Sequence, residues 1–137
     1  MPKQKLWIIL GAVVVVALIA LVALNGAAPQ TSSAATVQTI SPQDYQSRFA
    51  ADTPHFLLDV RTPEEFATGY ITGATNISVQ TLADRLSEVP KDTPVVVYCR
   101  SGNRSAQAAR ILSDAGYSEI YDLGGVNSWT AAGLPLQ

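Results

Sequence analysis

The chain has very few of the residues that build redox and metal centres. Its 137 residues include one cysteine, Cys99, and one histidine, His55. A single cysteine excludes an internal disulfide, a pair of redox cysteines and any cysteine-rich metal site. His55 precedes an expected strand and has no neighbour that suggests metal binding or proton transfer, so we interpret it as a structural surface residue. Cys99 is therefore either a buried apolar residue or a reactive thiol. From the same scarcity of ligand residues we expect neither a bound metal nor a cofactor.

The chain is also short of positive charge. Nine Lys and Arg against eleven Asp and Glu give a net charge of -2, and Lys3 and Lys5 precede a long apolar stretch. Without these two lysines the balance is seven against eleven, or -4. This net negative charge argues against nucleic acid as a partner of the folded part. The folded part has the length of one domain.

Charged residues are absent from residues 6–24, and all of these residues but Gly11 are apolar. At about 1.5 Å per residue, a helix of this length spans roughly the 30 Å of a bilayer core. Lysines precede the stretch, and no Lys or Arg follows it before Arg48. The sequence therefore predicts one transmembrane helix in the inner membrane, with residues 1–5 in the cytoplasm and the domain on the periplasmic side.

A cleaved secretory signal is the alternative interpretation of the same stretch. Small residues that suit a signal peptidase follow it at Ala27, Ala34 and Ala35, and after cleavage the domain would be periplasmic or secreted. Residues 25–36 are rich in Ala, Ser and Thr and carry no charge, which predicts a flexible linker before a domain at residues 37–137.

Within the domain, apolar runs alternate with amphipathic stretches that carry helix-capping residues. Ser41 and Thr62 each precede a proline and an acidic residue, the pattern of a helix N-terminus. The expected strands are 36–40, 56–60, 74–78, 94–98 and 119–123. The expected helices are 42–51, a short one after Thr62, 80–88, 105–115 and 126–132, with a turn at Gly124-Gly125. This alternation predicts an α/β fold with a mostly parallel sheet between helices.

Cys99 directly follows the strongly β-branched strand at 94–98. Ligand sites in open α/β sheets lie beyond the carboxyl ends of the strands. In the loop after Cys99, Gly102 allows backbone conformations in which several N–H groups point at one anion. The helix that follows adds the partial positive charge of its N-terminus. Both effects favour a thiolate over a thiol.

Arg100 and Arg104 lie on either side of this loop, near the start of a helix, where a cation is mildly unfavourable unless an anion is bound. The simplest interpretation is a site that holds a thiolate or persulfide beside an oxyanionic donor. A buried Cys99 with two solvated arginines is the structural alternative.

With its flanking pieces, this loop resembles the active-site loop of the rhodanese (thiosulfate sulfurtransferase) homology domain of the single-domain bacterial type. The match extends from about Ile40 to Leu136. Its motifs are Leu58-Asp59-Val60-Arg61, Glu64-Glu65-Phe66, Gly69-Tyr70-Ile71, Gly73-Ala74, Asn76-Ile77, the Cys99 loop, Gly124-Gly125, Trp129 and Gly133-Leu134-Pro135. The resemblance implies a three-layer fold with five mostly parallel strands between helices.

The resemblance also implies that Cys99 alternates between thiolate and persulfide. The residues implied to cradle the sulfane sulfur through backbone N–H groups are Arg100, Ser101, Gly102, Asn103 and Arg104. Basic side chains of the loop are implied to favour thiosulfate-like donors. Asp59 and Arg61 match positions that pair structurally, and Tyr70 stands where the family often has histidine.

The sequence thus predicts a sulfurtransferase that moves sulfane sulfur from a thiosulfate-like donor to a thiophilic acceptor through Cys99. Without a second cysteine, the acceptor is external: cyanide, a small thiol or a partner protein. A non-catalytic or carrier-type binding module at the membrane is one alternative. A phosphatase or arsenate reductase on the same architecture is another, disfavoured because such enzymes resemble a Cys-x5-Arg spacing, whereas Arg104 follows Cys99 after four residues.

Overall fold

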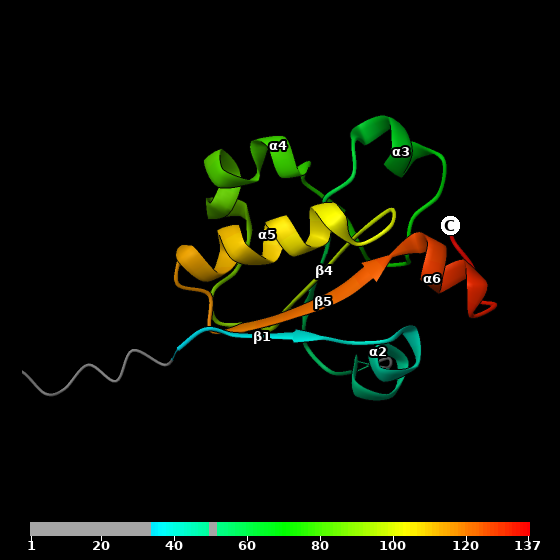
Figure 1. Cartoon of the computed structure of the whole chain (residues 1–137), viewed down its shortest axis with the longest axis horizontal. Coiled ribbons are helices and arrows are strands. Elements are labelled where there is room, and N and C mark those ends of the chain that lie inside the picture. The colour runs from blue at the N-terminus through cyan, green and yellow to red at the C-terminus, as the bar shows by residue number, and fades with distance from the viewer. Residues whose placement is uncertain (1–33, 50–51) are drawn as a thin grey trace, which may run out of the picture. The chain divides into compact units, whose positions relative to one another are not determined.

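A computed structural model of the protein describes residues 34–49 and 52–137. Its strands form one sheet in the order β1-β5-β4-β2-β3, and every neighbouring pair is parallel (Figure 1). The strands are β1 Thr36–Thr39, β2 Phe56–Asp59, β3 Thr75–Asn76, β4 Val95–Cys99 and β5 Glu119–Gly125. The helices are α2 Pro42–Phe49, α3 Pro63–Ala67, α4 Val79–Leu82, the 3-10 helix η1 Ala83–Glu88, α5 Asn103–Asp114 and α6 Val126–Ala131. The predicted α/β fold with a parallel five-stranded sheet is confirmed.

The predicted membrane segment at residues 6–24 lies outside the described residues, as does most of the predicted linker at 25–36. Within 34–49 and 52–137, no helix has the length and apolar character needed to cross a bilayer. Thr36, where we expect the linker to end, is the first residue of β1.

Helices cover both faces of the sheet, and β4 is buried between them (Figure 1). Because successive side chains of a strand point to opposite faces, β4 contributes to two apolar clusters. Val95, Val97 and Cys99 join the cluster that includes residues of α4 and α5. Val96 and Tyr98 join the cluster that includes residues of α2 and α6. Tyr98 and Trp129 both belong to the core, with exposed fractions of 0% and 6%.

The predicted helix starts at Ser41 and Thr62 are confirmed by their hydrogen bonds. The backbone N–H of Asp44 donates to Ser41 Oγ, and the Asp44 carboxylate accepts from Ser41 in return. Thr62 and Glu65 form the same reciprocal box at the start of α3. Each box satisfies backbone donors that a helix otherwise leaves unpaired at its first turn.

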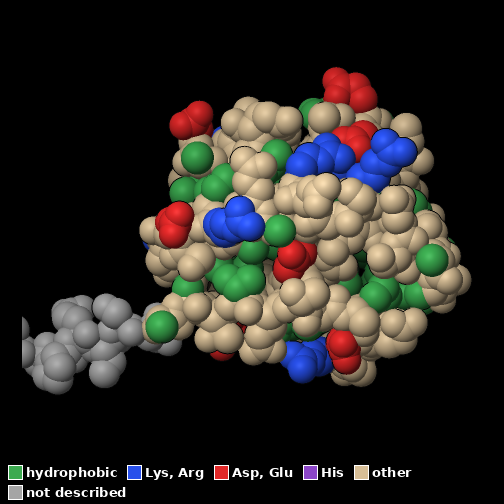
Figure 2. All heavy atoms as spheres, in the orientation of Figure 1, with side chains coloured by type: hydrophobic (Ala, Val, Ile, Leu, Met, Phe, Trp, Pro, Cys, Tyr) green, Lys and Arg blue, Asp and Glu red, His purple; other side chains and the backbone are tan. Residues whose placement is uncertain are grey.

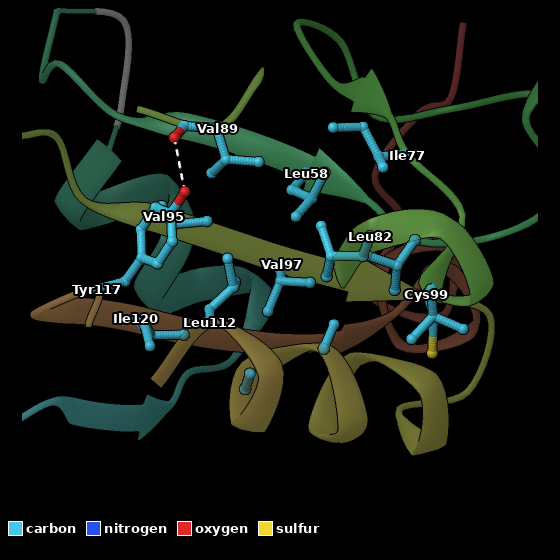
Figure 3. Packing of buried hydrophobic residues seen from close by; sticks show 14 residues of the cluster. Leu58, Ile77, Leu82, Val89, Val95, Val97, Cys99, Leu112, Tyr117 and Ile120 are labelled. Carbon is cyan, nitrogen blue, oxygen red and sulfur yellow. Dashed lines mark hydrogen bonds between the residues drawn. The ribbon is translucent and has the colours of Figure 1, made fainter. Parts of the chain in front are cut away.

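The single helix predicted at 80–88 is wrong, because α4 ends at Leu82 and a 3-10 segment follows. Arg85 has φ -114° and ψ 18°, outside the helical region. The Tyr117 hydroxyl lies 2.8 Å from the carbonyl oxygen of Leu86 and 2.7 Å from that of Val89 (the second contact is drawn in Figure 3). The Leu86 carbonyl also accepts the Val89 N–H in a 3-10 bond, so the buried Tyr117 holds this end of the segment with two further hydrogen bonds.

Candidate active site

Cys99 is the last residue of β4 and lies at the carboxyl edge of the sheet, with 1% of its surface exposed. Figure 3 shows it at one end of the buried cluster, beyond Val97 and beside Leu82. The backbone N–H of Gly102 donates to Cys99 Sγ across 3.0 Å. Gly102 has φ +108°, a conformation that side-chain-bearing residues rarely adopt. The glycine thus lets the loop turn back and present an N–H group to the sulfur.

Helix α5 begins at Asn103, two residues earlier than the sequence predicts. Asn103 and Arg104 therefore belong to its first turn, and Arg100, Ser101 and Gly102 form the connection from β4. The carbonyl oxygen of Gly102 accepts from the N–H of Ala106 and from the hydroxyl of buried Ser105. The positive end of the α5 dipole thus lies directly behind the loop that carries the Gly102 N–H.

Gly125 forms the opposite wall of the loop and is paired with Cys99 in the β4-β5 register. A Cβ at Gly125 would lie 2.2 Å from the carbonyl oxygen of Arg100 and 2.6 Å from the Ser101 nitrogen. The Asn127 N–H, in the first turn of α6, donates to the same Arg100 oxygen across 3.2 Å. Only a residue without a side chain allows β5 and the loop to approach this closely.

Arg104 pairs with Glu65 of α3, a partner that sequence reasoning missed. Its two terminal guanidinium nitrogens donate to the two carboxylate oxygens across 2.6 and 2.8 Å. These hydrogen bonds lower the pKa of Glu65 to about 2 and raise the pKa of Arg104. The side chain of Arg104 is therefore anchored to α3, whereas its role in cradling sulfur stays a prediction.

Asp59 and Arg61 form the structural ion pair that the resemblance implies. The Arg61 Nη2 atom lies 2.6 Å from Asp59 Oδ2, and both residues are almost fully buried. Nη2 also donates to the carbonyl oxygen of Gly69 across 2.7 Å. The pair thus ties the end of β2 to the segment that follows α3, beside the candidate site.

A pocket of about 550 Å³ opens between α3 and α6 next to the loop. Its lining residues are Arg61, Glu64, Glu65, Thr68, Gly69, Arg100, Val126, Asn127, Thr130 and Leu136. Figure 2 shows acidic and basic side chains side by side over α3 and the first turns of α5. The pocket therefore offers both charges and apolar surface to a ligand that contacts Arg100, the residue after Cys99.

Comparison with known proteins agrees with this geometry. Residues 41–132 match the family described as the rhodanese-like domain. The chain belongs to the rhodanese-like domain family. A sulfurtransferase of Allochromatium vinosum is 41% identical over 101 residues, which cover 73% of this chain and 94% of the relative. The thiosulfate sulfurtransferase GlpE of Pseudomonas aeruginosa is 36% identical over 95 residues, covering 69% and 84%.

Solved structures of rhodanese-like proteins have the same fold. The crystal structure of a rhodanese-related protein from Thermoplasma volcanium superposes with a TM-score of 0.66 at 32% identity. The match covers 73% of this chain and 97% of that one. The comparisons therefore establish a single rhodanese-like domain with sulfurtransferases among its relatives.

His55 and Tyr70 of this rhodanese-like domain have structural partners. His55 precedes β2, so it lies at the amino edge of the sheet, whereas Cys99 lies at the carboxyl edge. Its Nδ1 donates to the Thr53 carbonyl oxygen, so that Nε2 accepts from the Tyr45 hydroxyl, each across 2.8 Å. Tyr70 stacks on Phe66 with ring centroids 4.2 Å apart. Among the described residues, no cluster of three or more His, Cys, Asp or Glu is suited to a metal ion.

Proposed function

We propose that this rhodanese-like domain is a sulfurtransferase that takes sulfane sulfur from a thiosulfate-like donor as a persulfide on Cys99. One observation supports this most strongly: the Gly102 N–H donates to Cys99 Sγ at the start of α5. The N–H group and the positive end of the helix dipole both interact favourably with negative charge on this sulfur as it attacks or leaves. The thiolate is the form that attacks a sulfur atom.

The proposed transfer has two balanced half-reactions. The Cys99 thiolate attacks the outer sulfur of thiosulfate and forms an S–S bond, while the S–S bond of thiosulfate breaks and sulfite leaves with the electron pair. A nucleophilic acceptor then attacks the outer sulfur of the persulfide, and Cys99 leaves as a thiolate. Neither step needs a general base, which fits the position of His55 at the other edge of the sheet.

The charges at the loop suit an oxyanionic donor. Arg100 follows Cys99, is exposed and lines the pocket between α3 and α6, so its guanidinium can pair with the sulfonate oxygens of thiosulfate. Arg104 is already engaged by Glu65. We therefore assign the donor-binding charge to Arg100 and the anchoring of the loop to Arg104.

The direct test is the Cys99→Ser variant in an assay that follows thiocyanate formed from thiosulfate and cyanide. We expect turnover to fall to the uncatalysed rate, with circular dichroism showing an unchanged fold. Turnover equal to that of the unaltered chain would overturn the assignment. Transfer to a partner protein without multiple turnover would instead support the carrier-type alternative.

We also propose that residues 6–24 anchor the domain on the periplasmic side of the inner membrane. The uncharged, apolar composition of this stretch and the lysines before it support the proposal. A tagged full chain should stay with the membrane after carbonate extraction and be degraded by protease added to spheroplasts. Release by osmotic shock would favour signal cleavage, and protection from protease would contradict the orientation.

A further inference from the structure

Two opposite charges in the pocket between α3 and α6 are not used by the fold. Of the four charged side chains that line this pocket, Arg61 and Glu65 are held in ion pairs. The other two, Glu64 and Arg100, are exposed and make no side-chain hydrogen bond or ion pair with any residue in the described ranges. Although both line one pocket, they do not pair with each other. They are free to pair with a ligand that carries both charges.

The pocket adjoins the loop that carries the reacting sulfur, because Arg100 is one of its lining residues. Arg100 follows Cys99 in the chain, and its carbonyl oxygen is held by the Asn127 N–H of α6. Val126 and Leu136 give part of the lining an apolar character. A molecule bound between α3 and α6 therefore contacts Arg100, the residue that follows Cys99.

This inference rests on the proposed sulfurtransferase function. We propose that the pocket binds the sulfur acceptor, and that the acceptor is a small thiol with both an ammonium and a carboxylate group, such as free cysteine. Arg100 pairs with the carboxylate, and Glu64 at the first turn of α3 pairs with the ammonium group. Cyanide or a neutral thiol leaves both charges without partners.

The transfer to such an acceptor is balanced without a further oxidant or reductant. The acceptor enters as a thiolate, after its proton has passed to water, and attacks the outer sulfur of the Cys99 persulfide. A new S–S bond forms on the acceptor, the S–S bond at Cys99 breaks, and the electron pair returns to Cys99 Sγ. Arg100 serves both half-reactions, because sulfite leaves before the acceptor binds.

The test uses the full chain, loaded with thiosulfate and freed of excess donor. Loss of the persulfide is followed by intact mass after addition of cysteine, cysteine methyl ester, N-acetylcysteine or 2-mercaptoethanol. Each rate is divided by the rate of the same thiol with a small free disulfide, which removes differences in intrinsic reactivity. We expect cysteine to react fastest, with a loss of about threefold to fivefold for each missing charge, as for exposed ion pairs.

Variants separate the two charges. Glu64→Gln should make cysteine and N-acetylcysteine equally fast, and Arg100→Gln should do the same for cysteine and its methyl ester once loading is complete. Glu119→Gln, an exposed acid at the amino end of β5, is the matched control and should keep the preference for cysteine. Equal normalised rates for all four thiols in the unaltered chain would overturn the inference, whereas failure to load would overturn the proposed function itself.

Discussion

Arg104 in the first turn of α5 and Glu65 in the first turn of α3 form a two-pronged ion pair across 39 residues of sequence. Glu65 also accepts the backbone N–H of Thr62, so one carboxylate caps α3 and holds α5. Since α5 begins directly after Gly102, this pair fixes the helix end behind the Cys99 loop. It explains why an arginine is tolerated near the positive end of a helix.

The Arg104–Glu65 pair predicts a pH-dependent contribution to stability. Its hydrogen bonds lower the pKa of Glu65 from 4.5 to about 2. A carboxyl whose pKa is lower in the folded state stabilises above its unfolded pKa and loses that contribution as the pH falls. We expect Glu65→Gln to reduce the free energy of unfolding by about 1 kcal/mol at neutral pH, since the pair is partly exposed.

Urea denaturation at several pH values tests this contribution. The difference between the unaltered chain and Glu65→Gln should shrink as the pH falls from about 5 towards 2. Glu64→Gln is the matched control, because the neighbouring Glu64 has no ion pair among the described residues. A difference for Glu65→Gln that stays constant over this pH range would contradict the predicted coupling.

Gly125→Ala should distort the Cys99 loop. The added Cβ would lie 2.2 Å from the Arg100 carbonyl oxygen, so the backbone of β5 or of the loop must shift. We expect a loss of roughly 2–3 kcal/mol in the free energy of unfolding, and slower persulfide loading in the molecules that remain folded. Gly73→Ala is the control, because an alanine at φ +86° is also strained but its Cβ has no atom within 4 Å. Equal loading rates in both variants would show that the close approach of Gly125 to the loop does not affect persulfide formation.

Asp59→Asn should be strongly destabilising, because it leaves the buried Arg61 guanidinium without its carboxylate. Breaking a buried pair on one side costs about 3 kcal/mol or more. Replacing both partners, as in Asp59→Leu with Arg61→Met, should cost less than the single change, since no buried charge remains. The measurement is the free energy of unfolding in urea, and a double variant less stable than Asp59→Asn would contradict this reasoning.

The domain should not hydrolyse aryl phosphates. The loop places Arg104 after four residues, and the Arg104 side chain is already paired with Glu65. A phosphate would therefore find a short loop with one arginine engaged elsewhere. Incubation with p-nitrophenyl phosphate should release no nitrophenol above the level of Cys99→Ser. Release that depends on Cys99 would favour the phosphatase alternative.

Local signals explain how far the fold could be predicted from the sequence. Ser41 and Thr62 mark helix starts through capping chemistry that acts within four residues, and both were correct. The β-branched run before Cys99 marked a buried strand. The prediction of a single helix at 80–88 is wrong because the backbone there is held by Tyr117. This residue lies far along the chain and contacts Leu86 and Val89 only after folding.

The candidate site shows the same division between local and long-range information. Cys99 and Gly102 could be picked out because the loop is continuous in sequence. The partner of Arg104 could not be predicted, because α3 and α5 become neighbours only through the order of the strands in the folded sheet. In the sequence, Glu65 shows only the pattern of a helix cap. That Glu64 and Arg100 lack ion-pair partners among the described residues follows only from the folded positions of Arg61, Glu65 and Arg104.

The most direct measurement is the intact mass of the purified chain after incubation with thiosulfate. The proposed mechanism predicts a gain of one sulfur atom per chain, absent in Cys99→Ser and lost on addition of cyanide or a thiol. A chain whose mass does not change, or an adduct that forms without Cys99, would contradict the assignment of Cys99 as the persulfide-forming nucleophile.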